Sequence, residues 1–157
     1  AESDFVTRVV GTVNTWGVNP ANLVIEVTET SMIDRLEDAQ ELLQKLRTYG
    51  FKIALDDFGT GYSSLAYLHK LPLDIVKLDK SLVKDLPEQR PIAIVQFVTQ
   101  LAKNLGAEVV GEGVETSVHR ACLGELGCNL GQGYLFGRPL ERADWLAYCQ
   151  KHAVDAL

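Results

Sequence analysis

The stretch ALDDFGTGYSSL, residues 54–65, places two adjacent aspartates between a short apolar run and a loop with two glycines. Adjacent carboxylates repel each other wherever water screens them poorly, and this repulsion grows steeply as the local dielectric falls. The run before Asp56 and Asp57 is typical of a buried strand, so both aspartates are expected where that strand turns into the loop. Both side chains could converge there, and bound cations would offset their repulsion.

Short β-rich runs alternate with segments of helical period on both sides of this stretch. The predicted strands are, in chain order, Leu23–Val27, Phe51–Leu55, Ile75–Leu78, Val109–Gly111 and Gly133–Phe136. The predicted helices are Phe5–Trp16, 34–50 with Gly50 as a stop, Pro91–Leu105 before Gly106, Val118–Leu126 and Asp144–His152. This alternation predicts βαβ units with right-handed crossovers and a largely parallel sheet. Periodicity leaves open whether the sheet closes into a barrel.

The composition is that of a folded globular protein. Of 157 residues, 46% are hydrophobic and 23% are charged, which excludes a disordered chain and fits one domain over residues 1–157. The net charge of −6 argues against a protein that binds the phosphates of a nucleic acid polymer. Binding of a single nucleotide together with metal ions is compatible with this charge. Since the chain has no long apolar run and no signal-peptide pattern at its start, we expect a cytoplasmic protein without a membrane segment.

The cysteines and histidines do not form a metal-binding pattern. Cys122, Cys128 and Cys149 include no CxxC pair, so they are expected to be small buried apolar residues in a reducing compartment. The three histidines lie far apart in the sequence without an HExxH motif, which makes a histidine-based zinc site improbable.

Acidic residues recur at or just after the ends of the predicted strands. They are Glu26, Asp56, Asp57, Asp79 and Glu112. In parallel α/β folds, ligands bind at the edge of the sheet where the C-terminal ends of the strands meet. The repetition therefore predicts that these carboxylates lie together at this mouth of the sheet, with Lys77 from a strand interior beside them. Oxygen ligands favour Mg²⁺ or Mn²⁺, and two such ions about 4 Å apart suit phosphodiester cleavage.

A simpler interpretation remains open for each of these residues. Asp57 or Glu115 could cap the helix that follows it, and Lys77 could extend its ammonium into solvent. The glycines of the loop do not match a P-loop, and GQGYLFG, residues 131–137, is a weak match to a dinucleotide fingerprint because it lacks the strand–turn–helix context.

Five motifs together resemble those of the EAL domain family, the cyclic di-GMP phosphodiesterases of bacterial signalling. In order and spacing they are IEVTET (25–30), DDFGTGYSSL (56–65), VKLDKSLV (76–83), GEGVET (111–116) and GQGYLFGRP (131–139). The resemblance runs from about residue 5 to about residue 150. It implies a TIM-like barrel that binds two Mg²⁺ or Mn²⁺ ions and hydrolyses cyclic di-GMP to linear pGpG.

The resemblance also implies a role for each matching residue. The metal ligands would be Glu26 and Asp56 for the first ion, and Asp56, Asp57 and Glu112 for the second. The catalytic residues would be Lys77, which holds the attacking water, and Glu112. Gln132 and Asp79 would lie at the substrate. Glu29 would anchor the DFGTGYSS loop, which in this family also helps to form dimers.

The chain departs from the family pattern in length. A complete barrel takes about 250 residues, whereas this chain has 157 and lacks the first strands with the Glu-Ala-Leu segment, an arginine and an asparagine of the family. We therefore expect an incomplete TIM-like (β/α) barrel with a half-built first metal site. Two functions stay open: weak or absent hydrolysis, or a non-catalytic EAL module that binds cyclic di-GMP or a protein partner. Exposed sheet edges or the DFGTGYSS loop would favour a homo-oligomer.

Overall fold

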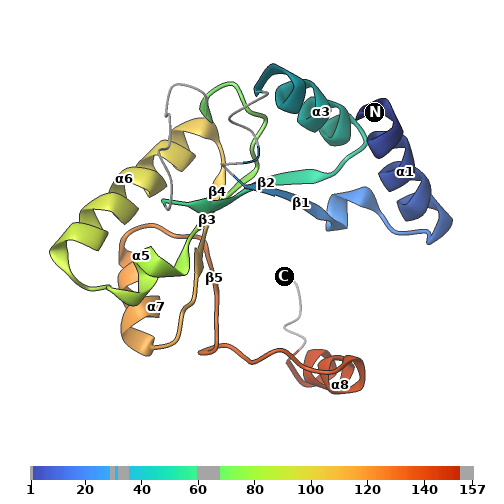
Figure 1. Ribbon diagram of the computed structural model, residues 1–157. Coiled ribbons are helices and arrows are strands. Elements are labelled where there is room, and N and C mark those ends of the chain that lie inside the picture. Colours follow the sequence, from blue (N-terminus) through green and yellow to red (C-terminus); the bar gives the residue numbers. More distant parts are fainter. Residues whose placement is uncertain (1, 29–30, 32–35, 60–67, 153–157) are drawn as a thin grey trace.

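Five parallel strands form one sheet whose spatial order is the order of the chain (Figure 1). The computed structural model describes residues 2–28, 31, 36–59 and 68–152. The strands are β1 (Val24–Thr28), β2 (Lys52–Phe58), β3 (Ile75–Leu78), β4 (Glu108–Glu112) and β5 (Leu130–Gln132). Parallel strands that add in chain order build the curved wall of a barrel, and described helices separate β1 from β2, β3 from β4 and β4 from β5. The predicted partial TIM-like barrel is confirmed.

Apart from α8, the helices that the structure describes lie along one face of this sheet and leave the other face open. They are α1 (Glu2–Thr15), the 3₁₀ helix η1 (Pro20–Asn22), α3 (Leu36–Thr48), α5 (Lys80–Lys84), α6 (Gln89–Leu105), α7 (Ser117–Glu125) and α8 (Arg142–His152). In Figure 1, α1 and α3 lie beside β1 and β2, α6 and α7 lie beside the later strands, and α8 stands apart from the sheet. All five predicted helices are present, and the short η1 and α5 are additions to them.

The hydrophobic core lies between the sheet and the helices. Leu43 and Leu46 of α3 and Val95 and Val98 of α6 are almost completely buried, as the three- and four-residue spacing of their apolar faces predicts. They pack into one cluster with strand residues such as Leu78. Burying a side chain of this size contributes about 1.5–3 kcal/mol, so the covered face of the sheet holds the strands in register while the open face remains available for polar side chains.

The fifth strand is not where the sequence predicts it. Residues 133–136 form a turn, in which Phe136 N donates to Gly133 O at 3.1 Å, and β5 is the preceding segment Leu130–Gln132. The β-favouring residues Tyr134, Leu135 and Phe136 suggested a strand, but the segment that pairs with β4 is the Leu-Gly-Gln run. Tertiary pairing overrides local strand propensity here.

The three cysteines are free and half-buried, and Cys122 and Cys128 pack against the core. Burial, with a smaller effect of the neighbouring Cys122, raises the pKa of the Cys128 thiol to about 11, so Cys128 stays protonated and unreactive at neutral pH. Within the described ranges, none of the helices is both long and apolar enough to span a bilayer.

Candidate functional site

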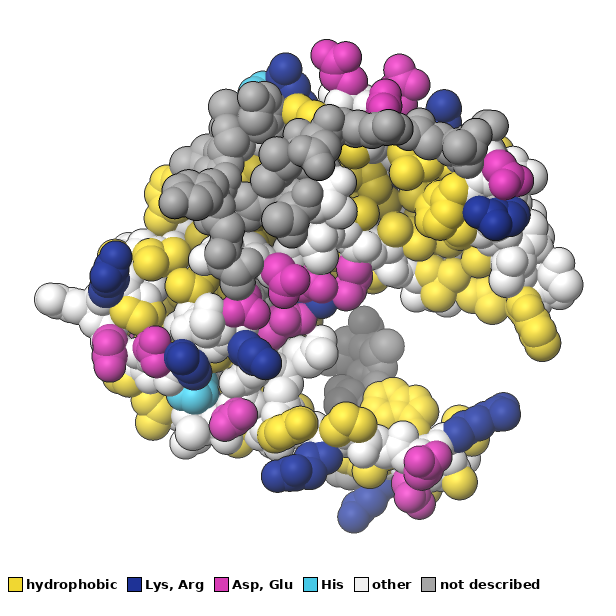
Figure 2. Space-filling view, in the orientation of Figure 1, with side chains coloured by type: hydrophobic (Ala, Val, Ile, Leu, Met, Phe, Trp, Pro, Cys, Tyr) yellow, Lys and Arg dark blue, Asp and Glu magenta, His cyan; other side chains and the backbone are white. Residues whose placement is uncertain are grey.

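Lys77 of β3 lies at the centre of a cluster of three carboxylates. Its Nζ atom is 2.9 Å from Glu26 Oε1, 3.0 Å from Asp56 Oδ1 and 2.8 Å from Glu112 Oε1. Only 9% of the lysine side chain is exposed, against 20–21% for Asp56 and Glu112 and 48% for Glu26. Figure 2 shows acidic side chains gathered around a basic one at the edge of the central hollow. Of the five acids predicted to converge, the structure brings three, Glu26, Asp56 and Glu112, to Lys77.

Strand register brings these four side chains together. β1, β2, β3 and β4 are neighbours in that order, and Lys77 lies opposite Val110, two residues before Glu112. Side chains alternate between the two faces of a strand, so the flanking Val76 and Leu78 enter the core while Lys77 faces the open side. A single polar residue within the buried strand IVKL thus carries its ammonium to the mouth of the sheet.

The electrostatic balance of the cluster keeps Lys77 charged. Burial lowers the pKa of its ammonium, but the hydrogen bonds to Glu112, Glu26 and Asp56 outweigh burial, and the net pKa lies above its ordinary value. Three carboxylates around one ammonium leave an excess of negative charge at the mouth. This excess would attract a further cation.

A bulge in β2 places the two adjacent aspartates. The pairing of β2 with β3 shifts register between Leu55 and Phe58, and Asp57 between them has the left-handed φ of 56°. The backbone N–H of Asp57 donates to Asp56 Oδ1 at 3.0 Å. A bulge breaks the two-residue alternation of a strand, so Asp56 and Asp57 are not forced onto opposite faces. A left-handed φ at a residue other than glycine costs about 1–3 kcal/mol and is concentrated at functional sites.

Gln132 lies beside Glu112 on the neighbouring strand, as its register partner. The Gln132 side chain is exposed, and its backbone oxygen accepts from Val114 N at 3.0 Å. The structure therefore puts the last strand residue of β5 next to the carboxylate cluster, although the sequence did not predict residue 132 to be part of a strand.

Asp79 caps a helix, which is the simpler role that the sequence left open for acids after strands. Its carboxylate caps α5 by accepting from Ser81 N at 2.9 Å. Burial raises the pKa of Asp79, but the hydrogen bonds from Ser81 and Lys80 outweigh it and hold the net pKa below the ordinary value. Its place at the substrate stays a prediction.

The capping alternative for Glu115 is not what the structure shows. The N-cap of α7 is Thr116, whose hydroxyl accepts from His119 N at 3.1 Å. Glu29 and most of the DFGTGYSS loop, residues 60–64, lie outside the described residues. The loop-anchor role of Glu29 therefore stays a prediction.

The cluster fits divalent cations by its donor chemistry. Carboxylate oxygens are the ligands that Mg²⁺ and Mn²⁺ prefer, and Glu26, Asp56 and Glu112 already surround a positive charge. In the part of the chain that the structure describes, no three acidic, histidine or cysteine side chains are already arranged around a metal position. The ammonium of Lys77 contacts one oxygen of each of the three carboxylates, Glu26 Oε1, Asp56 Oδ1 and Glu112 Oε1.

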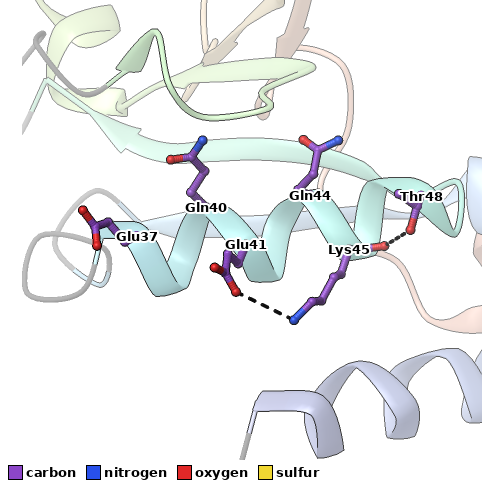
Figure 3. A pocket seen from close by; sticks show the side chains of 6 residues that line it. All are labelled: Glu37, Gln40, Glu41, Gln44, Lys45 and Thr48. Carbon is purple, nitrogen blue, oxygen red and sulfur yellow. Dashed lines mark hydrogen bonds and ion pairs between the residues drawn. The ribbon is translucent and has the colours of Figure 1, made fainter.

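A second depression lies along the outer surface of α3 (Figure 3). It is lined by Glu37, Gln40, Glu41, Gln44, Lys45 and Thr48. Its polar groups pair within the helix: Lys45 Nζ lies 4.0 Å from Glu41 Oε2, and Thr48 donates to the Lys45 carbonyl at 2.7 Å. Exposed pairs four residues apart contribute only a few tenths of a kcal/mol, and this surface has the character of a solvated helix face.

Comparisons with known proteins agree with the predicted family. Cyclic di-GMP phosphodiesterase NbdA of Pseudomonas aeruginosa is 44% identical over 141 residues, which cover 89% of this chain and 18% of NbdA. The crystal structure of the EAL domain of Mycobacterium smegmatis DcpA has a TM-score of 0.88 at 34% identity, covering 94% of this chain and 66% of that one. A manganese and cyclic di-GMP complex of Klebsiella pneumoniae BlrP1 has a TM-score of 0.81 at 39% identity, covering 87% of this chain and 35% of that one.

The chain thus spans about a fifth of NbdA and about a third of the BlrP1 chain. The family model described as the EAL domain matches residues 1–139. With its parallel strands in chain order and its acidic cluster at their C-terminal ends, this chain belongs to the EAL domain family.

Proposed function

We propose that this chain is a single domain, residues 1–157, that hydrolyses cyclic di-GMP to linear pGpG. The observation that carries the proposal is the convergence of Glu26, Asp56 and Glu112 on Lys77 from four neighbouring strands. The name of NbdA and the cyclic di-GMP complex of BlrP1 support the substrate. In the reaction, the water oxygen forms a bond to phosphorus and keeps one proton, while the bond from phosphorus to one ribose oxygen breaks. The other proton of the water goes to that released ribose oxygen.

The proposed cofactors are two Mg²⁺ or Mn²⁺ ions, a choice that the manganese complex of BlrP1 supports. Glu26, Asp56, Asp57 and Glu112 would hold them through carboxylate oxygens. When bound, two divalent ions stabilise negative charge on the attacking and leaving oxygens of a phosphodiester. The bulge at Asp57 lets two adjacent residues contribute to this site.

The other side chains of the site are proposed to bind the substrate and to orient the attacking water. Lys77 is charged and buried, so its ammonium can donate hydrogen bonds to the attacking water once the carboxylates turn toward cations. Gln132 has an amide that can donate to a phosphate oxygen or accept from water, and it stands beside Glu112. Asp79 is proposed to contact substrate in addition to capping α5, and Glu29 is proposed to anchor the adjacent loop.

A second candidate function is binding without catalysis. The specific observation in its favour is that the Lys77 ammonium pairs with Glu26, Asp56 and Glu112, the same carboxylates that would hold the cations. A module in this state would bind cyclic di-GMP or a protein partner through the mouth of the sheet and leave the phosphodiester intact.

We also propose that the chain self-associates. Among the described strands, β1 and β5 form the two ends of the sheet, each with one neighbour. Val24 in β1 and Leu130 in β5 are 42% and 52% exposed. Unpaired edges with exposed apolar side chains favour strand addition, and a second copy could place its β1 beside β5 with the polarity that this sheet already has. The DFGTGYSS loop is the alternative contact.

Activity and binding are separated by one experiment. The purified chain is incubated with cyclic di-GMP and Mg²⁺ or Mn²⁺, and linear product is resolved by chromatography beside Asp57→Asn and a chelator control. Metal-dependent product that is lost in the variant supports hydrolysis. If calorimetry detects cyclic di-GMP binding by the folded chain but no product forms, hydrolysis is wrong and the binding module is supported.

A further inference from the structure

Gly133 lies against the backbone of the segment that follows β4. A side-chain carbon at position 133 would lie 2.7 Å from the carbonyl carbon of Val114, and closer still to the nitrogen and oxygen of the same residue. Real Cβ atoms essentially never approach backbone that closely. The φ angle of Gly133 is not in the left-handed region, so glycine is required here by close approach and not by backbone conformation.

Two hydrogen bonds hold the two segments together at this contact. Val114 N donates to Gln132 O at 3.0 Å, and Leu135 N donates to Val114 O at 3.0 Å. Val114 is completely buried, so neither of its backbone groups can exchange this partner for water without cost. We call this pair of hydrogen bonds, with Gly133 between them, the Val114 clasp.

The clasp lies next to the site from two directions. Gln132 directly precedes Gly133, and Glu112 is two residues before Val114 and is the register partner of Gln132. On the other side, Gly113 has a φ of 68°, and a side-chain carbon there would lie 2.6 Å from Cβ of Lys80 at the start of α5. The segment 112–114 is therefore confined between the turn after β5 and the first residue of α5.

We propose that Gly133 is a positioning residue: by admitting the Val114 clasp, it fixes the Glu112 carboxylate at Lys77 and keeps Gln132 beside it. The metal-binding part of this inference rests on the proposed function, whereas the placement of Glu112 at Lys77 does not. A methyl group at position 133 meets backbone, which cannot rotate away as a side chain can. The displacement must therefore be taken up by residues 112–114 or by the turn itself.

The experiment compares the full chain with Gly133→Ala and Gly137→Ala. Gly137 is a matched control, because it lies in the same turn region, has no left-handed φ, and has open space where its Cβ would lie. Amide hydrogen exchange at Val114 and Leu135 and the ¹⁵N resonance of the Lys77 ammonium are followed by NMR. Mn²⁺ affinity is measured separately by electron paramagnetic resonance, and the melting temperature reports global stability.

In Gly133→Ala we expect both amides to exchange roughly tenfold faster or more, as the loss of a backbone hydrogen bond allows. The Lys77 resonance should shift because Glu112 moves, and Mn²⁺ affinity should fall about 10- to 100-fold, the usual effect of displacing a metal ligand through its support. Gly137→Ala should match the wild type in all of these. Unchanged exchange and an unchanged Lys77 resonance in Gly133→Ala would overturn the proposal, as would equal changes in Gly137→Ala.

Two further outcomes of this experiment also test the proposal. If the wild type binds no Mn²⁺, the proposed metal site fails, while the exchange and Lys77 data still judge the positioning role of Gly133. If Gly133→Ala does not fold, the wild type decides: exchange at Val114 and Leu135 as slow as at the buried strand amides supports the clasp, and rapid exchange at either residue overturns it.

Discussion

Lys77 Nζ lies 2.8 Å from Glu112 Oε1 on the neighbouring strand, the shortest of the three ion pairs that this lysine makes with described residues. Both side chains are largely buried, at 9% and 20% exposure. The pair brings the proposed water-holding group into direct contact with a proposed metal ligand. We therefore expect cation binding and the ion pair to compete for the same carboxylate, which would link metal binding to the stability of the cluster.

Replacement of Lys77 by methionine tests this competition. Without the ammonium, three carboxylates face one another, so we expect the free energy of unfolding at neutral pH to fall by about 1–3 kcal/mol. Mn²⁺ should stabilise Lys77→Met more than the wild type, because a cation then replaces the missing charge. Thermal unfolding with and without Mn²⁺ measures both effects. Lys52→Met, at an exposed position of β2, is the control, and equal Mn²⁺ stabilisation of all three proteins would contradict the competition.

Two substitutions at Asp57 separate the effect of backbone strain from the effect of the carboxylate charge. Asparagine tolerates the left-handed region well, whereas a β-branched residue does not. Asp57→Asn should keep the melting temperature near that of the wild type and weaken Mn²⁺ binding, since it removes one proposed ligand charge. Asp57→Val should in addition lose about 1–3 kcal/mol of stability. Denaturant unfolding and Mn²⁺ titration of the two variants provide the test. Equal stability of the two would mean that the bulge does not impose the φ of 56°.

Asp79 provides a pH-dependent prediction. Because its pKa in the folded chain lies below the ordinary value of 3.8, the ionised cap stabilises the fold above that value, and this contribution is lost as pH falls through the lowered pKa. Asp79→Ala should be about 1 kcal/mol less stable than the wild type at neutral pH. The difference should shrink below about pH 4.

Asp79→Asn separates the cap from the charge. Asparagine caps helices about as well as aspartate, so this variant should keep most of the stability that Asp79→Ala loses. Denaturant unfolding of the three proteins at several pH values measures both comparisons. A stability difference between Asp79→Ala and the wild type that does not shrink at all as pH falls below 3.8 would show that the carboxylate charge has no part in the cap.

Self-association is tested at the β5 edge. Leu130→Lys places a charge on an exposed edge strand, a device that natural sheets use to prevent strand addition. We expect the wild type to sediment as a dimer at micromolar concentration and Leu130→Lys to sediment as a monomer. Phe97→Lys is the matched control, because Phe97 on α6 is exposed to nearly the same extent, 51% against 52%, and does not lie on the sheet. A wild-type monomer would contradict pairing through the edges.

The sequence by itself determined the alternation of strand and helix, the parallel sheet and the acids at the strand ends. These features are local, because the apolar periods of Leu43 and Leu46 in a helix and of Val76 and Leu78 in a strand are set by near neighbours. The five motifs, in their order and spacing, were also sufficient to predict the family.

Only the tertiary structure decided how those residues meet. The contact of Lys77 with three carboxylates depends on the register of four strands, which is fixed by packing between residues far apart in the chain. The position of β5 depends on pairing with β4, and it prevailed over the strand propensity of Tyr134 and Phe136. The need for glycine at position 133 comes from the Val114 backbone, which approaches it only after folding. Local propensity encodes elements, whereas register and close contact are set by the packed core.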